Sequence, residues 1–148
     1  MHPKFEVIPK IGVGPVKLGV TRASVIESMG VEPKSFMKSP MSAHPTDSFF
    51  DAGFQIFYDG EPPKVESIEL SRGCGFEICF SGCKILDFPV QDALIKLESI
   101  TGYKPETEDH GYSYEIPELG LWVWRQSNEE NDDESLYFAT IGVGKTNT

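Results

Sequence analysis

The sequence predicts an α+β fold in which a mostly antiparallel β-sheet carries two helices packed on one face. Short segments with alternating apolar residues occur in runs, and only two segments have helical signals. The regular strand–helix alternation of a parallel sheet is missing. Because 148 residues is near the usual size of one domain, and no break in composition divides the chain, we expect a single domain over residues 1–148.

The first 30 residues predict two strands and a short helix. Phe5–Ile8 is apolar enough for a strand, and the Gly/Pro-rich residues 12–15 interrupt it. A second strand is expected over residues 16–18, where apolar residues alternate with a lysine. Thr21 is a suitable N-cap for the helix that follows, and Gly30 is a suitable end.

The middle of the chain predicts a long loop followed by a run of strands. Residues 31–51 contain three prolines and no regular period, so we expect an ordered loop over one end of the sheet. Alternating apolar residues then predict three or four antiparallel strands. These expected strands cover residues 53–58, 65–70, 76–80 and 83–86, and the turn Ser81-Gly82 joins the last two as a tight hairpin.

The last part of the chain predicts a longer helix and three further strands. Pro89 opens the helix after Asp87 or Phe88 as cap, its apolar residues fall on one face, and Gly102 ends it. The expected strands cover residues 112–116, 121–126 and 136–143.

Charge and hydropathy exclude several classes of function. The formal net charge of −10 repels nucleic acids and anionic membrane surfaces and attracts cationic proteins. No stretch approaches the roughly 18 apolar residues that a membrane span requires. The N-terminal residues have no apolar run typical of a signal peptide, so a cytoplasmic location is expected.

Residues that could support metal or nucleophilic chemistry are few and badly spaced. Cys74, Cys79 and Cys83 lack the paired spacing and the nearby histidines of a zinc site. The chain has three histidines and no nucleophile motif, and its Gly-Val-Gly segments lack the spacing of a phosphate loop. We therefore expect no metal, no cofactor and no enzyme activity.

The acidic residues are concentrated near aromatic residues in the C-terminal third. Residues 106–134 contain ten acidic residues against one basic residue, Arg125. Trp122 and Trp124 would share one face of a strand, where aromatic anchors beside steering carboxylates suit a basic protein partner. An alternative is that the loop is merely solvated and the tryptophans are core residues. The predicted partner-binding residues are Tyr112, Trp122, Trp124, Glu129, Glu130, Asp132, Asp133 and Glu134.

Several stretches together resemble a family of small uncharacterised bacterial proteins. They include GVGPVKLGVT at residues 12–21, FYDG at 57–60, GYSYEIP at 111–117 and YFATIGVG at 137–144. The resemblance spans nearly the whole chain and carries over no catalytic residue. By analogy, small acidic cytoplasmic bacterial proteins of this kind are often immunity proteins that neutralise a cationic toxin domain.

A shorter resemblance concerns residues 14–30 alone. The order strand, Leu-Gly-Val-Thr, helix and glycine is similar to the opening of modules in the group of β-lactamase-inhibitor proteins and outer-membrane-assembly lipoproteins. Those modules bind proteins through their helices and sheet. This sequence departs from them by having Val20 where methionine is usual.

Two rival functions follow from other features. A small-molecule-binding protein or enzyme would have its pocket between the loop of residues 36–50 and the sheet, with His44, Asp47 and Cys74 as its polar groups. A structural subunit that binds a second copy of itself through an edge strand is the third possibility.

Overall fold

The fold comes from a computed structural model that describes residues 3–146. The two residues at each end of the predicted domain, among them His2, lie outside this range. The first half contains β1 (Lys4–Ile8), β2 (Gly12–Val13), β3 (Val16–Lys17), α1 (Arg22–Met29), β4 (Lys34–Phe36), β5 (Thr46–Phe49), β6 (Phe54–Asp59) and β7 (Lys64–Ser71). The second half contains β8 (Glu77–Phe80), η1 (Ile85–Asp87), α2 (Val90–Thr101), β9 (Ser113–Ile116), η2 (Pro117–Leu119), β10 (Leu121–Trp124), η3 (Asp133–Ser135) and β11 (Thr140–Gly144).

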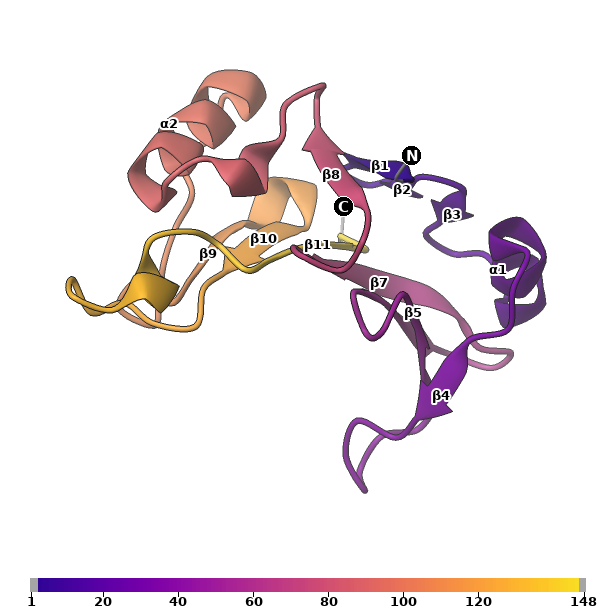
Figure 1. The fold of residues 1–148 in the computed structure, drawn as a ribbon. Coiled ribbons are helices and arrows are strands. Elements are labelled where there is room, and N and C mark those ends of the chain that lie inside the picture. The colour runs from indigo at the N-terminus through magenta and orange to yellow at the C-terminus, as the bar shows by residue number, and fades with distance from the viewer. Residues whose placement is uncertain (1–2, 147–148) are drawn as a thin grey trace.

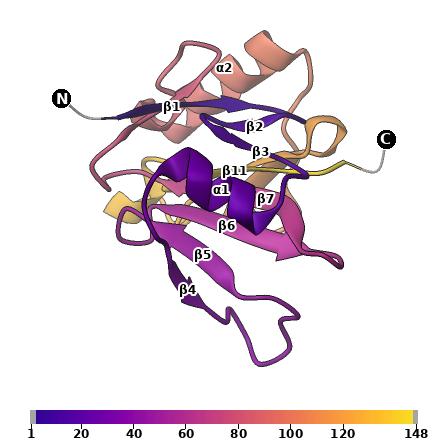
Figure 2. The same ribbon diagram turned by 90° about the vertical axis from the view of Figure 1, so that its right-hand side faces the viewer.

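The strands form two sheets. The larger sheet has seven antiparallel strands in the order β4-β5-β6-β7-β11-β10-β9, and the smaller has the order β3-β2-β1-β8. Only the β1–β8 pair is parallel among the named strands. Both α-helices and the smaller sheet lie on the same side of the larger sheet (Figures 1 and 2). The predicted α+β class, with a mostly antiparallel sheet and two helices on one face, is confirmed.

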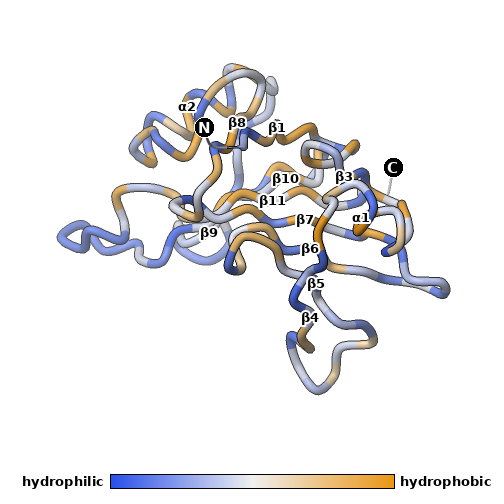
Figure 3. The backbone as a smooth tube through the Cα atoms, turned by 45° about the vertical axis from the view of Figure 1, so that its right-hand side comes forward, coloured by the Kyte–Doolittle hydropathy of each residue, from blue (hydrophilic) through white to orange (hydrophobic). Residues whose placement is uncertain are grey.

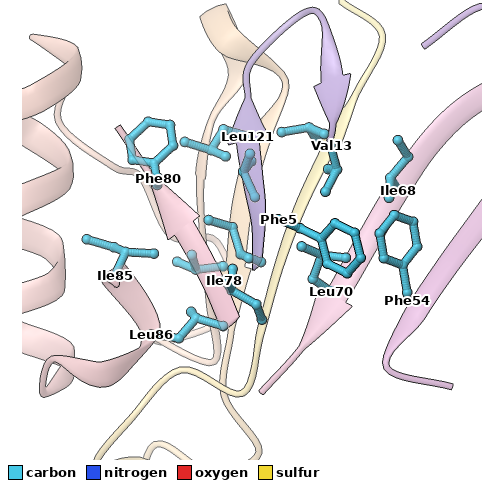
Figure 4. Close-up of a cluster of buried hydrophobic side chains, with 14 of the residues drawn as sticks. Phe5, Val13, Phe54, Ile68, Leu70, Ile78, Phe80, Ile85, Leu86 and Leu121 are labelled. Atoms are coloured by element: carbon cyan, nitrogen blue, oxygen red, sulfur yellow. The ribbon is translucent and has the colours of Figure 1, made fainter. Parts of the chain in front are cut away.

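The core fills the space between the two sheets (Figure 4). The ring of Phe5 lies 5.0 Å from that of Phe54 and 5.3 Å from that of Phe76, both in edge-to-face contact. Ile68 and Leu70 of β7 are fully buried beneath them. Because side chains alternate along a strand, the residues between these positions point to the opposite side of the larger sheet, which we call the outer face.

Both helices end at the predicted glycines, and α1 also begins at its predicted cap. The Thr21 hydroxyl accepts a hydrogen bond from the Ser24 amide at 3.3 Å, and Gly30 closes α1 in the left-handed conformation. Gly102 closes α2 in the same way. The N-cap of α2 is Pro89 rather than Asp87 or Phe88, because the ψ of 152° at Pro89 is not helical and Val90 begins the helix.

The segment 31–51 is not a simple loop, because it contains β4 and β5. All four residues of β5 are buried, including Asp47, which a period-two pattern would require to be apolar. The Gly/Pro segment at 12–15 was also expected to interrupt the sheet. Its first two residues instead form β2, which pairs Val13 with Val16 across the turn.

Two strand predictions fail in the second half. Phe80 and Cys83 pair across the expected turn, but residues 85–87 then form η1, which buries Ile85 and Leu86 in the core. Strand β8 pairs with β1 instead of with a hairpin partner. The final strand begins at Thr140 rather than at residue 136, because the preceding residues form η3 and a loop.

The two edges of the larger sheet differ. At β9, Glu106 exchanges both backbone hydrogen bonds with Glu115, at 2.9 and 2.8 Å, so the edge is partly closed. At the other edge, the three residues of β4 are all exposed. Within residues 3–146, no helix has the length and hydropathy needed to cross a membrane.

Candidate functional site

The outer face near β10 carries the two tryptophans, as the sequence predicts. Leu121 and Val123 are buried on the core side of β10, whereas Trp122 is half-buried and Trp124 is 39% exposed. The strand register places Trp122 between Glu115 of β9 and Gly142 of β11. The tryptophan pair therefore belongs to the outer face and not to the core.

Trp122 lies across β11 because two glycines leave room for its indole. A Cβ atom at Gly142 would meet three ring atoms of Trp122 at 2.3 to 2.5 Å, and one at Gly144 would meet the ring at 3.3 Å. Neither glycine has a positive φ, so close approach of the indole is the reason for glycine here. Glu69 of β7 faces Gly142 on its other side.

Trp124 opens onto a hollow at the end of the outer face. The hollow has a volume of about 280 Å³ and lies between the ends of β7, β10 and β11 and the loop that contains η3. Its aromatic walls are Trp124 and Tyr137, and its charged residues are Arg72, Asp133 and Glu134. The guanidinium carbon of Arg72 lies 4.7 Å from the centroid of the Tyr137 ring.

Arg125, the single base of the acidic segment, holds two loops together. Its Nε donates to the Gly111 carbonyl at 2.7 Å and its Nη1 to the Ser135 carbonyl at 2.8 Å. Asn128 adds a bond from its amide to the His110 carbonyl at 2.7 Å. Among the described residues, Arg125 pairs with no carboxylate, and its bonds go to carbonyl groups instead. Across residues 3–146, no acid of the 106–134 segment takes part in an ion pair.

Hydrophilic loops of the acidic segment extend from the sheet beside β9 (Figure 3). Asp109 has a structural position, since the Ser113 hydroxyl and amide donate to it at 2.6 and 2.9 Å and lower the pKa of its carboxyl. Asp132 caps η3 by accepting from the Glu134 amide at 3.0 Å. The remaining acids of the 128–134 loop, apart from this cap, have exposed side chains.

Apart from Asp132, which caps η3, the predicted site residues fall into three groups. Trp124, Asp133 and Glu134 line the hollow, and Trp122 lies beside it on the outer face. Glu129 and Glu130 are exposed at the tip of the same loop, outside the lining. Tyr112, although exposed, precedes β9 on the side that alternation assigns to Tyr114, away from the tryptophans.

The sequence did not identify Tyr137 and Arg72 as neighbours of this site. Arg72 follows β7 and Tyr137 precedes β11, so their meeting depends on the antiparallel β7–β11 pair, which joins residues about 70 positions apart. The spacing of the glycines at 142 and 144 on a strand was the one local sign of a close approach to the sheet.

The polar groups of the rival pocket lie apart. His44 lines a small hollow of about 190 Å³ and lies 3.6 Å from the Glu61 carboxylate, whereas Cys74 packs against Gly53 at the opposite end of β6. Asp47 is fully buried, and its carboxylate bonds to neither of them. These three residues therefore form no common site.

Asp47 instead joins α1 to three strands. Its carboxylate accepts from Arg22 Nε at 2.7 Å, from the Ser35 hydroxyl at 2.6 Å and from the Tyr58 hydroxyl at 2.7 Å. Burial alone would raise the pKa of Asp47, but the hydrogen bonds from Arg22, Ser35 and Tyr58 outweigh it and lower the pKa. Burial, followed by the bond to Asp47, raises the pKa of Tyr58. This arrangement has the character of a structural ion pair.

The cysteines and acids show no arrangement for metal chemistry. In the range 3–146, no three side chains of His, Cys, Asp or Glu are placed to hold a metal ion. Cys79 is buried, and burial raises the pKa of its thiol. A raised pKa disfavours the thiolate that a nucleophile or a metal ligand needs.

The fold and this surface define an α+β protein with an uncovered sheet face that is both acidic and aromatic. Comparison of the chain with protein-family models, with curated proteins and with solved structures finds no match. The family resemblance in the sequence accordingly stays a prediction, and the function has to be argued from the surface itself.

Proposed function

We propose that this chain is a protein-binding module that takes a basic protein partner on its outer face, around Trp124 and the 128–134 loop. The carrying observation is an exposed tryptophan beside carboxylates that have no ion-pair partner in the described structure. Exposed aromatic residues supply anchoring contacts, and unpaired carboxylates steer a cationic protein toward them.

The finer form of the proposal concerns the kind of partner. By analogy with other small acidic bacterial proteins, the partner would be a cationic toxin domain that this chain neutralises as an immunity-type inhibitor, and a cytoplasmic location would fit that role. Support for it comes from the net charge of −10 and its concentration in one segment. The rival small-molecule site has less support, since its three polar groups do not meet.

Affinity capture on the immobilised chain, followed by association kinetics with the captured protein, tests the proposal. We expect a basic partner whose association rate falls about tenfold or more between about 0.05 and 0.5 M ionic strength. Replacing Glu129, Glu130, Asp133 and Glu134 by their amides should slow association at low salt, because these acids supply the steering charge. Trp124→Ala should mainly speed dissociation.

A charge-matched control separates this surface from the net charge. Four exposed acids on the helix side can be replaced by amides with the same change of charge: Glu27, Glu32, Asp92 and Glu98. This control should associate at a rate close to wild type. The proposal fails if capture yields no basic protein or if association is insensitive to salt. It also fails if the association rate falls by the same factor in both quadruple variants.

A further inference from the structure

The hollow beside Trp124 contains an internal example of cation recognition. The guanidinium of Arg72 lies over the face of Tyr137, at 4.7 Å from the ring centroid. Trp124, the other aromatic wall, has no cation over its ring in the part of the chain described. Tryptophan is the best of the aromatic residues for such a contact.

The backbone that carries the two acidic residues of the hollow is held by η3. Asp132 Oδ1 accepts from the Glu134 amide at 3.0 Å, and the Ser135 hydroxyl donates to the Asp132 carbonyl at 2.6 Å. Arg125 fixes the same turn through the Ser135 carbonyl. Asp133 and Glu134 therefore project from a fixed turn beside the indole, which lowers the entropic cost of binding.

The charge of the hollow fits one added cation. Its charged lining residues are Arg72, Asp133 and Glu134, with a formal charge of −1, so a single guanidinium would leave the lining neutral. The hydroxyls of Ser71 and Thr140 provide further hydrogen-bond acceptors on the lining.

We propose that this hollow is a binding pocket for one arginine side chain of the basic partner, which would stack on Trp124 and donate to Asp133 and Glu134. This inference rests on the proposed function and specifies how the partner is recognised. A flat guanidinium stacks on an aromatic face and donates to two carboxylates at once, whereas a lysine ammonium is a compact and strongly hydrated charge. Arginine is therefore the expected residue.

Three small probes test the pocket in the intact chain. N-acetyl-L-arginine amide carries only the guanidinium charge, N-acetyl-L-lysine amide carries an ammonium, and N-acetyl-L-citrulline amide is a neutral analogue of similar shape. The readout is the indole N–H resonance of Trp124, assigned with Trp122→Phe and Trp124→Phe. We expect a saturable shift with the arginine probe, affinity roughly 10-fold weaker for the citrulline probe, and an intermediate value for lysine.

Two pairs of substitutions separate the pocket from general acidity. Asp133→Asn with Glu134→Gln should weaken the arginine probe about 10-fold or more, because both carboxylates are lost. Glu129→Gln with Glu130→Gln removes the same charge from the same loop and should change affinity less than about twofold. Trp124→Leu removes the indole reporter, so binding to this variant is followed by the backbone amide resonances of Asp133 and Glu134. This substitution should weaken the affinity for the arginine probe roughly 3- to 30-fold, and the dispersed amide spectrum verifies that each variant is folded.

The outcomes distinguish this pocket from the wider proposal. Equal affinity for the arginine and citrulline probes, or equal losses in the two acid pairs, overturns the arginine pocket. If a basic partner still associates in a salt-dependent way, the protein-binding function stands without it. If neither the probes nor a basic partner bind, both proposals fall.

Discussion

Substitution of Asp47 by asparagine should destabilise the fold, although the two side chains have nearly the same shape. The Asp47 carboxylate accepts hydrogen bonds from Arg22, Ser35 and Tyr58 and is fully buried. An asparagine keeps one acceptor oxygen and brings an NH₂ group that would face other donors. The change therefore removes charge-assisted bonds and leaves donors without acceptors.

The size of the effect follows from which partners can reach water. Each hydrogen bond to a charged group contributes about 1.5–3 kcal/mol, so three partners set an upper limit of about 4.5–9 kcal/mol. The Arg22 side chain is 47% exposed and Ser35 is exposed, so water can replace most of the hydrogen bonding that these two residues lose. Tyr58 is buried, so water cannot replace the hydrogen bond that its hydroxyl loses. We expect a loss of about 2–4 kcal/mol in the free energy of unfolding.

Urea unfolding followed by circular dichroism measures this loss. Asp59→Asn, at the exposed end of β6, is the matched control and should stay within about 0.5 kcal/mol of wild type. Because the folded pKa of Asp47 is lowered, its contribution is fully present above the unfolded value of about 3.9 and is lost as the pH falls toward the folded value. The difference in the free energy of unfolding between wild type and Asp47→Asn should therefore become smaller near pH 3.

Two results would contradict this reasoning. One is a loss for Asp47→Asn no larger than that of Asp59→Asn, which would mean that the network contributes little net stability. The other is a gap that stays constant or widens on acidification, which would mean that the folded pKa of Asp47 is not lowered.

Two further substitutions test the packing of the outer face and of its loop. Gly142→Ala would place a Cβ 2.3 Å from the Trp122 ring, so the indole must move toward water, at a cost of about 1–3 kcal/mol in the free energy of unfolding. Fluorescence in a Trp124→Phe background checks this: the emission of Trp122 should shift to the red, and the shift should be smaller for Gly144→Ala. A lysine at position 125 cannot make both carbonyl bonds of the guanidinium, so Arg125→Lys should lower the free energy of unfolding by about 1–2 kcal/mol and speed proteolysis within residues 126–134. Arg72 is exposed, and Arg72→Lys should leave the rate of that cleavage unchanged.

The helices were predictable because their signals are local. Thr21 and Gly30 lie at the two ends of α1, and Gly102 closes α2, so a window of a few residues contains the information. Strand β5 has no such signal. Its second residue, Asp47, occupies a buried position through bonds to Arg22 and Tyr58, which come from other elements. A pattern of apolar alternation cannot recognise a buried strand that contains a charged side chain.

The candidate site was predictable to a similar extent. The alternation of Trp122 and Trp124 with Leu121 and Val123 identified which side chains share a face, and the structure confirms it. The hollow was not predictable, since its walls combine one residue after β7 with another before β11. Tyr112 shows the converse error, because proximity in sequence to the acidic residues did not place it on the same face of the sheet.

The unequal edges of the larger sheet bear on how the protein resists aggregation. A free strand edge can recruit a strand from another molecule, and growth in both directions leads to fibres. Here the backbone of Glu106 already occupies part of the β9 edge, among carboxylates that would repel an approaching copy. Strand β4 offers only three residues, one of them Lys34. Strand addition is therefore hindered at one end of the sheet and limited to a short pairing at the other, and both features disfavour polymerisation of such a broad, open β-sheet.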